Sequence, residues 1–89
     1  VNAATIASAS AVDLVALFHH NFLQVTGSVA IGTIQTSFAG HKLAFLSIDG
    51  VDFLDIGTNN IKNKAGASIT VAPLTAIEYV CDGTNWYEI

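Results

Sequence analysis

Lys42–Ile56 reads KLAFLSIDGVDFLDI, and alternate side chains are apolar in both of its arms. This period of two is typical of β-strands. Both faces of the first arm are apolar, since Leu43 and Phe45 lie on the face opposite Leu46. A strand of this kind needs cover on each side.

Two short loops in the chain have turn sequences. Asp49-Gly50 joins the two arms above, and Asp-Gly is the dipeptide favoured by a two-residue type I′ turn. It predicts a hairpin, or else a sharp corner between two strands. The segments Ala76–Cys81 and Trp86–Ile89 flank a second turn that contains Asp82-Gly83, so a terminal hairpin is predicted there.

The rest of the chain also predicts an all-β fold of short strands with Gly and Asn turns. Further strands are expected at Phe22–Thr26, Val29–Thr33 and Ser68–Val71, and Pro73 marks a connection before the terminal hairpin. The glycines between these segments follow no fixed period, so the sequence does not establish a regular solenoid. Residues 1–21 form an N-terminal arm that fits either a strand at Val12–Leu17 or a short helix capped at Ser10.

Composition limits the partners that this chain can have. It has 89 residues, 52% of them hydrophobic and 11% charged, which fits one small β-rich module spanning residues 1–89 and excludes a disordered tail. Three lysines, no arginine and a net charge of -4 argue against nucleic acid as a partner. The longest apolar run, Leu14–Phe18, is too short for membrane insertion.

So many apolar residues in so small a chain predict an unusually apolar surface or cover by other copies. The chain contains no Met, which indicates processing of a longer protein with an upstream region. The single cysteine, Cys81, excludes an internal disulfide and a Cys-based zinc site.

We predict no catalytic residues, no cofactor and no enzyme activity. The seven acidic side chains are best explained as turn residues and solvated charges. His19, His20 and His41 are weak candidates for a metal on a threefold axis, but their spacing is not a known ligand motif. We therefore expect no metal.

Five residues are candidates for contact with a glycan. Aromatic rings stack on sugar rings and asparagine side chains hydrogen-bond to sugar hydroxyls; the candidates are Trp86, Tyr87, Asn59, Asn60 and Asn85. The alternative is that the two aromatic rings pack in the core or at an interface.

The C-terminal sequence resembles the end of bacteriophage tail fibre and tailspike proteins. Asp82-Gly83-Thr84-Asn85-Trp86-Tyr87-Glu88 is similar to the DGTxWYE strand pair near which those proteins finish. Upstream, Val25-Thr26-Gly27, Ile31–Ile34 and Gly40–Phe45 resemble the run that precedes it.

This resemblance implies a trimerisation or tip module at the C-terminal end of a longer fibre or spike. It implies an intertwined homotrimeric β-shaft, or a β-prism or β-helix-like module, that caps the virion tail in the extracellular space. The expected partners are two further copies of the chain and, at the tip, host cell-surface polysaccharide.

Two other functions stay open at this point. One is a monomeric carbohydrate-binding module, and the other is a fragment of a capsular polysaccharide depolymerase. The mass of the particle in solution separates the first of these from a homotrimer.

Overall fold

A computed structural model describes residues 3–13 and 20–89, and all the regular structure in them is β. The strands are β1 (Ala3–Ala7), β2 (Ala11–Val12), β3 (Phe22–Thr26), β4 (Thr33–Ile34), β5 (Lys42–Ser47), β6 (Val51–Phe53), β7 (Ile61–Lys62), β8 (Ile69–Val71), β9 (Thr75–Cys81) and β10 (Trp86–Glu88). The all-β prediction is confirmed. Most of the expected strand or helix at Val12–Leu17 lies outside the described residues.

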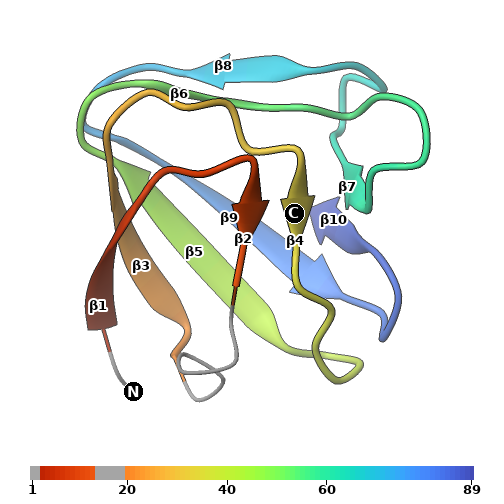
Figure 1. The fold of residues 1–89 in the computed structure, drawn as a ribbon. Coiled ribbons are helices and arrows are strands. Elements are labelled where there is room, and N and C mark those ends of the chain that lie inside the picture. The colour runs from red at the N-terminus through yellow and green to blue at the C-terminus, as the bar shows by residue number, and fades with distance from the viewer. Residues whose placement is uncertain (1–2, 14–19) are drawn as a thin grey trace.

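The strands form three sheets around one core. The largest has the order β1-β3-β5-β9-β10-β7, while β2 pairs with β4 and β6 pairs with β8. Figure 1 shows β2 and β4 in front of the large sheet, with β6 and β8 crossing above both. All of these pairings are made within one chain.

The first half of the chain winds as a β-solenoid. β1, β3 and β5 are parallel neighbours in the large sheet, and β2 and β4 are parallel neighbours in the second. Ala3 aligns with Phe22, 19 residues later, whereas Phe22 aligns with Ala44, 22 residues later. Because the corners differ in length, the repeat leaves no fixed period in the sequence.

The second half of the chain turns back and closes the solenoid. β8 runs antiparallel to β6, and β9 runs antiparallel to β5. β9 and β10 form the predicted terminal hairpin, with Trp86 opposite Cys81. That prediction is confirmed.

The hairpin predicted at Asp49-Gly50 is wrong. β5 and β6 do not pair with each other, because β5 lies in the large sheet and β6 in the sheet with β8. The two residues form a corner between sheets, the alternative that their sequence left open. Gly50 has a φ of +89°, but Asp49 does not have the positive φ that a type I′ turn requires.

Successive coils are tied together at this corner by side chains. The Asp49 carboxylate accepts a hydrogen bond of 2.7 Å from the backbone N–H of Gly27, at the same corner of the preceding coil. Ser8, in the coil before that, accepts one of 2.9 Å from the N–H of Val29. Gly27 has a φ of +80°, and a Cβ there would lie 2.9 Å from the Ser8 Oγ, so glycine is required.

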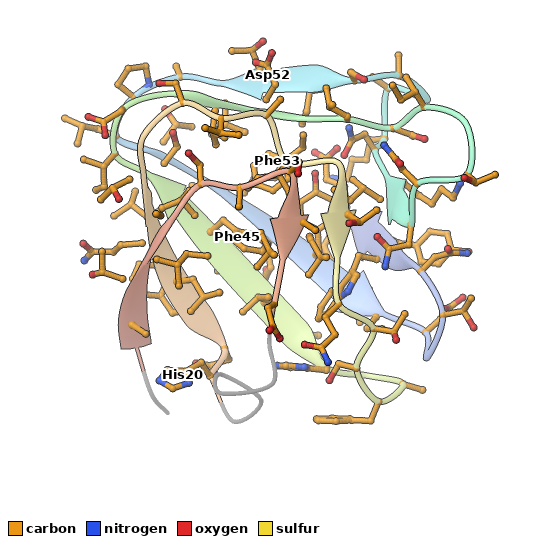
Figure 2. All side chains as sticks on the ribbon, viewed as in Figure 1. His20, Phe45, Asp52 and Phe53 are labelled. Atoms are coloured by element: carbon orange, nitrogen blue, oxygen red, sulfur yellow. The ribbon has the colours of Figure 1, made fainter. Side chains whose placement is uncertain are left out.

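The core is complete within the single chain. Phe45 and Phe53 meet inside the coil with ring centroids 5.3 Å apart, and Asp52 points out of it (Figure 2). The buried apolar side chains are Val12, Leu23, Val25, Ile31, Ile34, Leu43, Phe45, Val51, Phe53, Ile61, Val71, Tyr79, Cys81 and Trp86. The accessible surface, 4528 Å², is close to the roughly 5,000 Å² of a compact monomer of this mass.

Candidate interaction surface

The large sheet has a second face, which points away from the core. In each strand the buried side chains, such as Leu23, Phe45 and Tyr79, alternate with neighbours that point outward. The outward side chains that the strand register brings together are Thr5, Phe22, Gln24, Lys42, Ala44, Leu46, Lys62, Ala76, Glu78, Val80 and Tyr87. We call this set the outer sheet face.

The middle of the outer sheet face is apolar. Leu46 lies between Gln24 of β3 and Ala76 of β9, and Ala44 lies between Phe22 and Glu78. Glu78 is the only carboxylate in the set. The two lysines lie together at one margin, where Lys42 pairs with Val80 and Lys62 with Tyr87.

No described strand packs on this face. Phe22, Leu46 and Val80 do not belong to the core cluster of residues 3–13 and 20–89 or to the apolar side chains packed against it. They keep partial exposure, and Tyr87 is 41% exposed. The cover that the sequence of β5 requires on its second side is therefore not supplied by the described part of the chain.

The glycan candidates do not form one site. Trp86 is fully buried, with its indole N–H donating to the carbonyl of Gln35 at 3.0 Å, so the ring presents no face to a sugar. Tyr87, the next residue, is exposed on the outer sheet face.

The three candidate asparagines lie apart from Tyr87's ring or serve the backbone. The side chain of Asn60 accepts from the N–H of Ile34 and donates to its carbonyl, as a neighbouring strand would. Asn59 donates to the carbonyl of Leu54. Asn85 lies in the β9–β10 turn, where its N–H donates to Asp82.

Asp82 is a turn residue, as predicted, and its charge is stabilised there. Its carboxylate accepts bonds of 2.8 Å from the N–H groups of Asn85 and Thr84. These donors, with a smaller contribution from the Tyr87 hydroxyl, hold the pKa of Asp82 below its ordinary value of 3.8.

We therefore expect acid to weaken the fold partly through Asp82. A lowered folded-state pKa means that this contribution is fully present above pH 3.8 and is lost as the pH falls through the folded pKa. Urea unfolding between neutral pH and pH 3 should show a smaller loss of stability for Asp82→Asn than for the wild type. Equal acid slopes in the two proteins would contradict this role.

The histidines do not form a metal site in the described residues. Both ring nitrogens of His41 are bonded, Nδ1 to the Ser37 hydroxyl at 2.6 Å and Nε2 to the carbonyl of His20 at 2.8 Å. His41 is only 6% exposed and its ring stacks on Phe38. His19 lies outside the described residues. Among residues 3–13 and 20–89, no three His, Cys, Asp or Glu side chains gather where they could hold a metal.

Most of the acidic side chains accept hydrogen bonds that hold the fold. Asp52 accepts from the Thr70 hydroxyl at 2.7 Å, Asp55 from the N–H of Asn63, and Glu88 from the N–H of Lys64. Glu78 and Glu88 occupy adjacent strands but opposite faces, because Glu88 pairs with the inward-facing Tyr79. These positions account for the acids structurally.

A shallow groove of about 550 Å³ lies over β2 and β4. It is lined by Ala11, Val12, Asp13, Thr33, Ile34, Gln35, Thr36 and Asn60. Of the five glycan candidates it includes Asn60 alone, whose amide is already bonded to Ile34.

No family model, curated protein or solved structure matches this chain. Within the described residues, no helix is long and apolar enough to cross a membrane. The outer sheet face is therefore the feature on which a functional proposal can rest.

The sequence analysis did not single out this face as a site. Its one signal was the apolar second side of Lys42–Ser47. The contributions of β3 and β9 depend on strand register, which a single sequence does not contain.

Proposed function

We propose that this chain is a structural and interaction module that forms a homotrimer by burying the outer sheet face. The observation that supports the proposal is an apolar sheet face, centred on Leu46, on which no described strand packs. Packing sheet against sheet about 10 Å apart is the ordinary way to cover such a face.

The dimensions of the face suit a small interface. Five strands about 4.8 Å apart, each about five residues long, give a projected area on the order of 300 Å². The largest apolar patches of single proteins have about this size and are often functional. Three copies would bury on the order of 1,000 Å² in total, the lower end of specific interfaces.

The charges of the face also suit burial between copies. Glu78 and Lys42 occupy diagonal positions on neighbouring strands, β9 and β5. Opposite charges at the rim of an apolar patch orient association and disfavour wrong partners. The biological setting that we propose is the tail fibre or tailspike of a bacteriophage, an extracellular assembly, on the basis of the C-terminal Asp82–Glu88 resemblance.

The oligomeric state tests the proposal. Light scattering or sedimentation at micromolar concentration should give about three times 9.3 kDa for the wild type. Leu46→Lys should give a folded single copy, because three like charges would meet inside the interface. The lysine stem can lie along the sheet of the isolated chain, so the fold should persist.

Ile56→Lys is the matched control. Ile56 is 58% exposed and lies in a turn outside the outer sheet face, so the same change there should leave the trimer intact. A wild type that stays a single copy at these concentrations would overturn the proposal and favour the monomeric carbohydrate-binding module. Cleavage of capsular polysaccharide by the chain alone would favour the depolymerase fragment.

A further inference from the structure

A second surface lies at the other extreme of the solenoid, along its first coil. β1 is the edge of the large sheet, β2 is an edge of the second sheet, and residues 3–12 join them as one continuous coil. In Figure 1 this coil lies on the left of the coils that follow it. None of the described strands pairs with its outer side.

The backbone groups on that outer side follow from the hydrogen bonds on the inner side. Ser8 donates to the carbonyl of Thr26, and the carbonyls of Ser10 and Val12 accept from residues of the second coil. Successive residues of a strand direct their backbone groups to alternate sides. The N–H and C=O groups of Thr5, Ala7 and Ala11 therefore point away from the protein, and all three residues are exposed.

This edge lacks the features that normally prevent pairing with another strand. Natural edges are protected by charged side chains, proline, bulges or short length. β1 has five residues, AATIA, and the first charged residue of the chain is Asp13. Ala4 and Ile6 are half-buried at this end and pack against the core from one side.

The opposite edges of the same two sheets are closed. β7 has only two residues, Ile61 and Lys62, and Lys64 follows shortly after. In the second sheet, the side chain of Asn60 bonds to both backbone groups of Ile34. A second copy therefore offers no matching open coil for head-to-tail stacking.

From these observations we infer that residues 3–12 bind an extended segment of another polypeptide by β-strand addition. The segment runs parallel to β1 and turns the same corner, because only such a path reaches the free groups of both β1 and β2. It is uncharged, with apolar side chains at alternate positions to cover Ala4 and Ile6 and a small residue beside Ser8. Backbone hydrogen bonds supply the affinity and the alternate side chains supply the specificity.

A synthetic peptide tests the inference. The probe copies residues 22–34, FLQVTGSVAIGTI, with two added lysines for solubility, because this strand–corner–strand segment already stacks on the first coil from the inner side. Titrated into the ¹⁵N-labelled chain, it should shift the amide signals of Thr5, Ala7 and Ala11 and slow their hydrogen exchange. A peptide of the same composition in scrambled order should do neither.

Two variants make the test specific. Ala7→Pro removes an N–H that makes no bond within the chain, so the fold should be retained while binding weakens by about tenfold or more. Ala7→Lys keeps the N–H and adds a charge to the edge, with the same expected loss of binding. Ala65→Lys, in an exposed turn at the other end, should bind as the wild type does.

Three results would overturn the inference. They are the absence of shifts at these three amides at millimolar peptide, unchanged binding by both Ala7 variants, and shifts that depend on protein concentration without peptide. The last would show that a copy of the chain occupies the edge.

Discussion

The Trp86→Ala variant is expected to lose about 3–5 kcal/mol of unfolding free energy. Trp86 is fully buried, lies in register between Cys81 of β9 and Ile61 of β7, and meets the His41 ring edge-on with centroids 5.4 Å apart. Its removal leaves a large cavity and ends the bond from the indole to the Gln35 carbonyl. The total stability of an 89-residue domain is about 4–13 kcal/mol.

Urea unfolding followed by circular dichroism measures this loss without relying on the tryptophan signal. Tyr87→Ala is the control on the same strand, since Tyr87 is exposed and its loss should cost the isolated chain less than about 1 kcal/mol. A Trp86→Ala protein within about 1 kcal/mol of the wild type would contradict the buried position of the indole.

This contrast illustrates a limit of the sequence. Trp86 and Tyr87 are adjacent large aromatics, and in a strand one of the two must point inward. The sequence pattern placed Tyr87 on the face of Ile89 and Trp86 on the face of Glu88. Which face meets the core depends on the pairing of β10 with β9 and β7, and neither face is marked as the inner one by its own residues.

Local signals predicted the elements well. The strand at Phe22–Thr26 and the terminal hairpin follow from period-two alternation and from a turn that contains glycine, and both act over a few residues. The inward side of Ala76–Cys81 is also as its alternation predicts, with Tyr79 and Cys81 buried.

Long-range pairing could not be predicted. Asp49-Gly50 satisfies a hairpin and a corner equally, and the choice depends on the pairing of β5 with β9, which lies some thirty residues further along the chain. The solenoid was hidden because its first corner is shorter than its second. The outer sheet face and the open edge of β1 both follow from this arrangement.

The buried side chain of Asn63 is expected to contribute as much as a large core residue. Its amide donates to the carbonyls of Phe53 and Ala67, at 3.1 Å each, and its oxygen accepts from the Tyr79 hydroxyl. Burial raises the pKa of Tyr79, and the charges of Glu88 and Asp55 raise it further, so the hydroxyl stays a donor. Asn63 thereby joins the 63–67 turn to β6 and β9.

Asn63→Leu should therefore destabilise the protein by about 3 kcal/mol or more, because it leaves three buried groups without partners at about 1–3 kcal/mol each. Tyr79→Phe removes one hydroxyl and should cost about 1–2 kcal/mol. Urea unfolding of both variants and of the double variant measures the coupling between them.

The double variant should be less unstable than the sum of the two single changes, because Tyr79→Phe removes a hydroxyl that Asn63→Leu leaves unpaired. Thr70→Ala is a suitable control, since it removes an exposed side-chain hydrogen bond, to Asp52, on the outside of the same sheet and should cost less than about 1 kcal/mol. Strict additivity of the Asn63 and Tyr79 changes would show that the bond between them does not contribute to the fold. A coupling near 1 kcal/mol would establish Asn63 as the polar link between the closing strands and the solenoid.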